Sequence, residues 1–223
     1  LPMSSEVDWM WFWCIALRRG MAAHTRIVIK KMMQYIPGLG WAMDFANFVF
    51  LSRDWTLDQA QIVHCIDTFT GPAGYPFWLY IFPEGTDFAR RKHEKSLRFA
   101  RERGLPEYRH LLLPRSKGFV QSLRSCGSHI DAVYDVTIGY EEAVRPNFLT
   151  AMMGTRPLRV HVHVRRWRRD ELPAGDDERT RWLYDMWTEK DQLLDYFHKH
   201  KHFPKRADGA AVEDDGGDQR AHG

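Results

Sequence analysis

The sequence has only three cysteines in 223 residues, Cys14, Cys65 and Cys126, and no CxxC pair. Neither a disulfide framework nor a zinc site is therefore indicated, and a reducing compartment is the simpler interpretation. Long hydrophobic runs are also lacking. The longest one near the start, residues 9–17, is too short to span a bilayer and is not preceded by the basic stretch of a signal peptide. The chain is thus expected to contain no transmembrane segment.

Several widespread functional motifs are missing as well. There is no GxxxxGK[ST] phosphate loop and no GxSxG nucleophile motif, and "GLGWAM" has only two of the three glycines of a dinucleotide-binding turn. His161 and His163 alternate on one strand, and "HKHKH" spans residues 198–202. No carboxylate or cysteine stands at ligand spacing from them, which favours solvated basic residues over a metal site. We expect no bound metal and no cofactor.

The composition, 44% hydrophobic and 27% charged, suits a single globular domain with a real core. Residues 205–223 have five acidic and three basic residues and almost nothing to bury, so they are predicted to be a disordered polar tail. The remaining domain, residues 1–204, has a net charge of +5. This charge fits an anionic small substrate, a phospholipid surface or nucleic acid, without choosing between them.

Helical and strand patterns alternate along the domain. Period-two or continuous apolar runs predict strands at 25–30, 47–53, 77–82, 110–114, 130–138 and 158–166. Apolar residues at helical spacing predict a helix at 56–69 and a last helix with a stripe made of Trp182, Leu183, Met186, Trp187, Leu194 and Phe197. A helix at 6–19 is predicted from Ser5 and the acidic first turn that follows it, a charged helix at 92–103, and another helix from Ser116. The fold class is therefore α/β: a single domain with one main, mostly buried mixed sheet covered by helices.

The segment "IFPEGTDF", residues 81–88, ends the predicted strand at 77–82 with an unusual set of residues. The strand is uncharged, which is typical of burial on both faces. Pro83 stops the ladder, Gly85 lets the backbone approach another group closely, and Thr86 can cap the next element of the chain. A carboxylate and free amides at the end of a buried strand favour a ligand site. The alternative is an ordinary loop with a solvated Glu84.

Four blocks in this order, "SSEVDWMWFW", "FVFLSRDW", "FPEGTDF" and "LLLPRSKGF", resemble those of the glycerolipid acyltransferases. The resemblance covers residues 4–168 and is stronger to the lysocardiolipin acyltransferase-like branch of the 1-acylglycerol-3-phosphate acyltransferases. Asp87 after "FPEGT" and the segment "DAVYDVTIGY" (131–140) are also similar to that branch.

The resemblance implies roles for named residues. Asp8 matches the aspartate of the family's NHxxxxD pattern, which orients the catalytic histidine. Arg53 matches the arginine that holds the acceptor phosphate. Glu84, Gly85 and Thr86 match the block that lines the same pocket. The fourth block, usually on the acyl-donor side, corresponds to Pro114, Arg115 and Lys117; a plain basic loop is the alternative for the last two.

The sequence departs from the family pattern at the catalytic base. The position five residues before Asp8 is Met3, preceded by Pro2, where the family has histidine and asparagine. A thioether has no useful basicity near neutral pH. A truncated or differently joined upstream segment explains this more economically than catalysis by methionine.

By resemblance, we expect an acyl-CoA-dependent O-acyltransferase acting on a lysophospholipid at a membrane surface. Its location would be the endoplasmic reticulum, with the site toward the cytosol. A catalytically dead lipid- or acyl-CoA-binding member is the alternative. Nucleic acid is not an expected partner, because the aromatics follow core-like periods and are not interleaved with arginines. The face carrying Arg159, His161, His163 and Arg165 is predicted to meet anionic head groups, with a solvated basic strand as the alternative.

Overall fold

The structure is a computed structural model that describes residues 8–46, 48–52, 54–70, 76–141, 153 and 159–204. Met3 and Arg53, like the predicted tail at 205–223, lie outside the described residues. The helices and strands, in chain order, are α1 (Asp8–Arg18), η1 (Ala22–His24), β1 (Thr25–Lys30), η2 (Lys31–Tyr35), α2 (Leu39–Phe45), β2 (Val49–Leu51), α3 (Trp55–Thr70), β3 (Trp78–Tyr80), α4 (Arg90–Glu102), α5 (Ser116–Cys126), η3 (Gly127–His129), β4 (Ala132–Tyr140), β5 (Val160–Arg168), η4 (Arg169–Glu171) and α7 (Asp176–His200).

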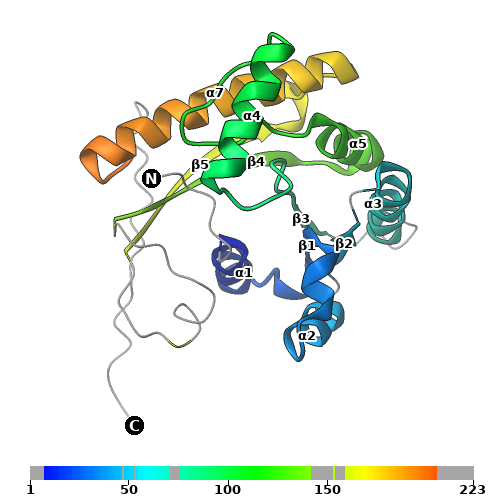
Figure 1. The fold of residues 1–223 in the computed structure, drawn as a ribbon. Coiled ribbons are helices and arrows are strands. Elements are labelled where there is room, and N and C mark those ends of the chain that lie inside the picture. The colour runs from blue at the N-terminus through cyan, green and yellow to red at the C-terminus, as the bar shows by residue number, and fades with distance from the viewer. Residues whose placement is uncertain are drawn as a thin grey trace.

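The strands of the described residues form two sheets and not the one main sheet that we predicted. β2, β1 and β3 form a parallel sheet in that order, with Val28 opposite Val49 and Arg26 opposite Leu79. β4 and β5 pair antiparallel, with Val136 opposite Val164. The predicted α/β class and single domain are confirmed. Figure 1 shows α7 above the β4–β5 ribbon and α2 at the opposite end of the molecule.

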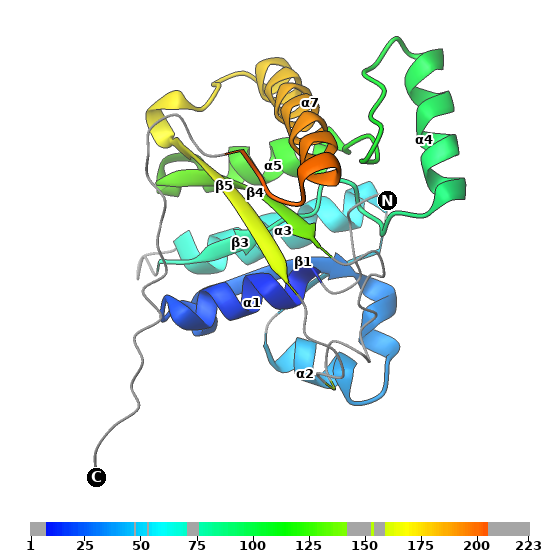
Figure 2. The ribbon, with the colours of Figure 1, turned by 90° about the vertical axis from the view of Figure 1, so that its left-hand side faces the viewer.

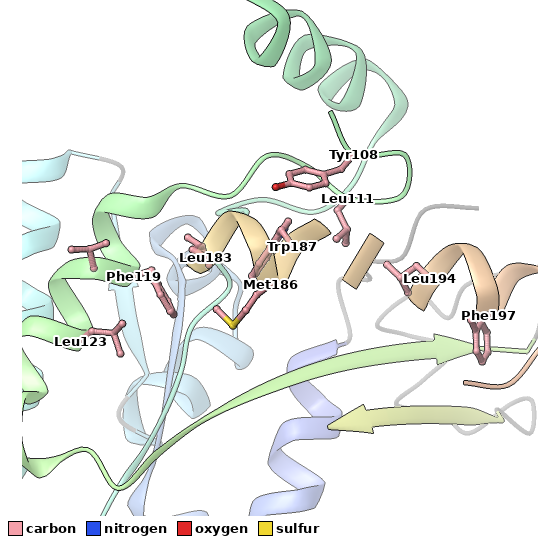
Figure 3. Close-up of a cluster of buried hydrophobic side chains, with 10 residues drawn as sticks. Tyr108, Leu111, Phe119, Leu123, Leu183, Met186, Trp187, Leu194 and Phe197 are labelled. Carbon is pink, nitrogen blue, oxygen red and sulfur yellow. The ribbon is translucent and has the colours of Figure 1, made fainter. Parts of the chain in front are cut away.

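The largest core lies between α5, α7 and the antiparallel sheet (Figure 3). The predicted stripe of the last helix is confirmed: Leu183, Met186, Trp187, Leu194 and Phe197 are buried in this core, and Trp182 packs against it. The helix begins with three acidic residues and ends with His198, Lys199 and His200, a charge order that its dipole favours.

Smaller clusters join the rest of the molecule to this core. Phe12 of α1 packs with Ile138 and Tyr140 of β4, which connects the first helix to the antiparallel sheet. Ile62 and Ile66 of α3 pack with Cys126 at the end of α5. A further cluster fixes the parallel sheet against α1 and α2, and contains Ile27, Met43, Phe48 and Phe50, with Trp9 and Trp13 against it.

Two local predictions are wrong. Residues 110–114 form no strand, because the amide of His110 donates to the carboxylate of Asp191 and the amide of Leu113 donates to the hydroxyl of Ser96. β3 is an edge strand: Leu79 packs against the cluster of α3 and Tyr80 against Phe12 of α1, yet its residues are only half-buried, so the predicted full burial on both faces is wrong. Helix α2, from Leu39 to Phe45, lies where no element was predicted.

Candidate active site

A cavity of about 2260 Å³ opens between the two sheets. Its walls come from α1, η2, β3 with the loop after it, α4, the loop before α5, β4 and α7. All of the predicted site residues that the structure describes line this one cavity: Asp8, Glu84, Gly85, Thr86, Pro114, Arg115 and Lys117. The structure therefore brings residues of all four sequence blocks to one place, with Leu51 from the second block, while Arg53 of that block lies outside the described residues.

Asp8 is the buried first residue of α1, where the helix dipole favours a negative charge. The hydroxyl of Tyr140, at the end of β4, donates a 2.6 Å hydrogen bond to its Oδ1. The indole Nε1 of Trp11 in turn donates to the Tyr140 hydroxyl at 2.9 Å. Tyr140 ends the segment that we singled out at 131–140, but nothing in the sequence predicted its contact with Asp8. Tyr140 thus holds this carboxylate oxygen in one position, and Trp11 fixes the tyrosine hydroxyl.

The loop after β3 is a tight turn pressed against the loop before α5. Gly85 has a φ of +64°, and its amide donates to the carbonyl of Phe82 at 2.9 Å. A side chain at this position would be strained, and its Cβ would lie 3.4 Å from Cδ of Arg115. The Arg115 amide donates to the Pro83 carbonyl at 2.8 Å, which joins the two loops. Glu84 is only 9% exposed, so the alternative of a solvated carboxylate at the strand end is wrong.

Thr86 does not cap a helix, contrary to our expectation. Helix α4 starts at Arg90, and its N-cap Ala89 makes no side-chain hydrogen bond. Instead the ammonium of Lys92 donates to the Thr86 hydroxyl at 2.9 Å and lies 2.8 Å from the Asp87 carboxylate. The sequence did not single out Lys92. Its position in the first turn of α4 gives the cavity wall a cation that is fixed by two neighbouring oxygens.

Two titratable groups in the cavity wall are unsuited to act as base or nucleophile at neutral pH. Burial raises the pKa of Tyr80 to about 12, so its phenol stays protonated. Burial likewise raises the pKa of the Cys126 thiol to about 12, with a smaller contribution from Cys65. A thiol is nucleophilic as the thiolate, so Cys126 is not a candidate for covalent catalysis.

The strand β5 turns part of its predicted polar face toward α7. The His161 ring lies 5.4 Å from the ring of Phe197, and Arg165 forms an ion pair with Glu189 of α7. Glu141 pairs with Arg159 and accepts from His161 at 2.7 Å, a hydrogen bond that lowers the pKa of the Glu141 carboxyl.

The ring of His163 also packs, 5.6 Å from the ring of Phe203. The contacts of His161, His163 and Arg165 with protein groups differ from a simple solvated strand, while Arg159 is exposed; the expected head-group contact stays a prediction. No group of three side chains suited to hold a metal ion occurs among the described residues.

The comparisons with known proteins point to one family. The Acyltransferase family model matches residues 4–141, and the Acyltransferase C-terminus model matches residues 151–216. The chain belongs to this acyltransferase family. The comparison with solved structures finds no significant match. None of the helices in the described part of the chain combines the length and hydropathy that crossing a bilayer requires.

Similar proteins carry names from two related groups. The chain is 40% identical over 200 residues to "Probable 1-acyl-sn-glycerol-3-phosphate acyltransferase 5" of Arabidopsis thaliana, covering 90% of this chain and 53% of that protein. It is 34% identical over 211 residues to "Lysocardiolipin acyltransferase 1" of Danio rerio, covering 93% and 53%. Human "1-acyl-sn-glycerol-3-phosphate acyltransferase delta" is 33% identical over 202 residues, covering 90% and 52%. The chain thus spans about half the length of these relatives.

Proposed function

We propose that this chain is an acyltransferase domain that moves an acyl group from acyl-CoA to the free hydroxyl of a lysophospholipid such as lysophosphatidic acid. The hydroxyl oxygen would attack the thioester carbonyl, and the thiol of coenzyme A would leave. The observation that carries this proposal is the meeting, in one cavity, of Asp8, the 84–86 turn and the 114–117 loop. The similar proteins named for lysophospholipid acylation support the same reaction class.

The cavity offers groups for each part of the two substrates. Phe12, Val136 and Ile138 give it an apolar wall suited to acyl chains. Arg115 and Lys117 stand on the loop before α5, where their charges suit the phosphates of the acyl donor. The turn of Glu84, Gly85 and Thr86 would bind the acceptor, with Arg53 on its phosphate. Acyl-CoA is then a co-substrate, and the reaction needs no further cofactor.

Asp8 supplies half of a catalytic pair. A carboxylate held by Tyr140 is suited to orient an imidazole and to stabilise the imidazolium that forms when the hydroxyl proton is taken. The residue at the histidine position is Met3, which cannot take a proton. This substitution favours a second candidate function for the chain as it reads: a member of the family that binds lipid or acyl-CoA without turning it over.

In the cell, the domain would work in phospholipid synthesis or remodelling at a membrane. We place it at the endoplasmic reticulum, with the cavity facing the cytosol, where acyl-CoA is available. This location follows from the resemblance and from the lipid substrates, and fractionation of cells expressing a tagged chain would test it.

The test restores the missing base. Pro2→Asn with Met3→His rebuilds the pattern "NHSSEVD" in front of Asp8. General-base catalysis contributes a factor of about 10²–10⁴, so the double variant is expected to release free thiol from acyl-CoA faster than the parent chain by up to this factor, in the presence of lysophosphatidic acid.

Asp8→Asn in the repaired chain is the matched control, and it should remove most of the gain. Reactions without acyl-CoA correct for the thiols of the protein itself. Robust turnover by the unmodified chain would show that the base lies elsewhere and that this site is wrong. If the repaired chain stays inactive but binds acyl-CoA, the non-catalytic function is the better description.

A further inference from the structure

Short helices η2 and α2 expose an unusual amount of apolar surface. Trp41 is 80% exposed, Phe45 is 92% exposed and Met32 is 74% exposed, and Tyr35 and Ile36 of the same segment are exposed as well. We call these five residues the η2–α2 face. Exposed apolar side chains are normal when scattered, but a group of large ones from one short segment marks a surface that contacts a partner.

Helix α2 presents its large aromatic side chains to the outside, the reverse of a typical surface helix. Its inward residues are Gly40 and Met43, whereas Trp41 and Phe45 point outward, with Asp44 as the charged residue between them. The inward face is tightly fixed. The amide of Gly40 donates to the carbonyl of Ile36 at 2.8 Å, and a Cβ at position 40 would overlap the carbonyl of Gln34. The two short helices therefore form one packed unit that holds the aromatic side chains outward.

The η2–α2 face is continuous with the cavity. Met32, Met33 and Ile36 line the same cavity as Asp8, although Met32 is largely exposed, so the segment forms part of the cavity rim. Figures 1 and 2 both place α2 at the end of the molecule opposite α7, so neither α7 nor the sheet below it covers this side. A molecule that leaves a surface in contact with the η2–α2 face would enter the cavity beside α1.

We propose that the η2–α2 face is the surface by which this domain docks on a phospholipid bilayer, with the cavity mouth turned toward the lipid. Tryptophan and tyrosine are the residues enriched at membrane interfaces, and here Trp41 and Tyr35 are combined with the more apolar Phe45. Exposed Lys31 beside the face, and Arg19 on the cavity wall, complement anionic head groups.

The choice of a bilayer as the partner and the entry of a lysophospholipid by this route both rest on the proposed function, whereas vesicle binding by the η2–α2 face can be measured without turnover. The observation that selects a bilayer over a protein partner is the shared rim. A lipid acceptor needs a path from the membrane to the cavity, and a protein seated on Met32 and Ile36 would obstruct that path.

The experiment is vesicle co-sedimentation of the full chain. The probes are vesicles of phosphatidylcholine alone and of phosphatidylcholine with phosphatidic acid. Trp41→Ser with Phe45→Ser should weaken partitioning to both vesicles by at least about tenfold, because two large apolar side chains no longer leave water. Leu57→Ser, which removes an exposed apolar side chain of α3, is the matched control and should bind as the parent does. Lys31→Glu should weaken binding to the anionic vesicles only.

Unfolding curves test whether each variant is folded, and sedimentation velocity without vesicles measures its oligomeric state. Equal vesicle binding by the parent and the Trp41–Phe45 double variant would overturn the proposal. A parent dimer that becomes a monomer in the double variant would also overturn it, and would identify the face as an interface between two copies. The outcome is separable from that of the proposed function, because docking needs no base: a repaired chain that docks normally but transfers no acyl group contradicts only the proposed function.

Discussion

Lys190 of α7 gives the sharpest stability prediction, because it forms a buried ion pair. Its ammonium lies 2.5 Å from the Asp135 carboxylate of β4 and donates to the carbonyl of Val136 at 2.7 Å. Lys190 and Asp135 are only 8% and 9% exposed. Replacing Lys190 with methionine keeps most of the side-chain volume but leaves a buried carboxylate without its cation.

The magnitude follows from that burial. Breaking a buried pair by removing one partner costs roughly 3–5 kcal/mol, because the remaining charge has lost its compensation. Total stabilities are about 5–15 kcal/mol, so Lys190→Met should remove a large share of the folding free energy. Replacing both partners, as Lys190→Met with Asp135→Leu, removes both charges and should recover most of the loss. About 1 kcal/mol remains for the Val136 carbonyl, which loses its donor.

Urea unfolding followed by circular dichroism and tryptophan fluorescence measures these differences. The control is Lys199→Met on the same helix, whose ammonium lies 2.5 Å from Asp195 but whose side chain is largely exposed. Exposed pairs contribute at most about 1 kcal/mol. If Lys190→Met costs no more than Lys199→Met, or if the double variant is as unstable as the single one, burial does not govern this pair and the reasoning fails.

Two further predictions concern packing and thiol chemistry. Gly139→Ala should destabilise the protein by about 1–3 kcal/mol, because its Cβ would lie 2.6 Å from the ring of Phe197. Gly118→Ala lies in a helix with open space around its Cβ and should stabilise the protein by about 0.5–1 kcal/mol. Thermal unfolding compares the two variants, and equal effects would contradict the packing around Gly139. In native protein at pH 8, exposed Cys14 should react with a disulfide reagent in a fast phase, and Cys14→Ser should remove that phase. Buried Cys126, with a pKa of about 12, should react only when the protein unfolds. Rapid labelling of Cys126 in the native protein would refute its burial.

Local periodicity was enough to predict most elements of the fold. The run "TRIVIK" predicts a strand at 25–30, and β1 spans Thr25–Lys30. The predicted helix at 56–69 is α3, and the stripe of the last helix is the side that α7 buries. These predictions succeed because one neighbouring layer decides which side of each element is apolar, and the pattern records that choice directly.

Features that the pattern could not predict depend on contacts between distant parts of the chain. The alternation at 158–166 correctly indicated a strand, but which set of residues faces α7 depends on aromatic partners about 40 residues later, such as Phe203. The segment at 110–114 is apolar and extended, yet its amides bond to side chains. An apolar run cannot distinguish such a segment from a strand, since only the hydrogen-bond partners differ.

The candidate site likewise combines features that the sequence could predict with features that it could not. The resemblance of the sequence blocks indicated which segments would lie together, and Asp8, the 84–86 turn and the 114–117 loop all line the cavity. The blocks could not predict Lys92, whose role depends on the turn of α4 that places it over Thr86. Nor could they predict Tyr140, which reaches Asp8 across 132 positions of the chain.

The contact between Tyr140 and Asp8 also bears on how a histidine at position 3 would work. The Asp8 carboxylate accepts a hydrogen bond from a phenol at 2.6 Å and lies at the start of a helix, so its direction is fixed and the helix dipole suits its charge. Both donors in this chain of hydrogen bonds come from elements within the described fold, Trp11 from α1 and Tyr140 from β4. We infer that the anionic partner of the catalytic pair is already in place in this protein. The repair at position 3 must therefore supply only the imidazole, and Tyr140→Phe in the repaired chain should shift its pH–rate profile, whereas loss of packing alone would lower the rate equally at every pH.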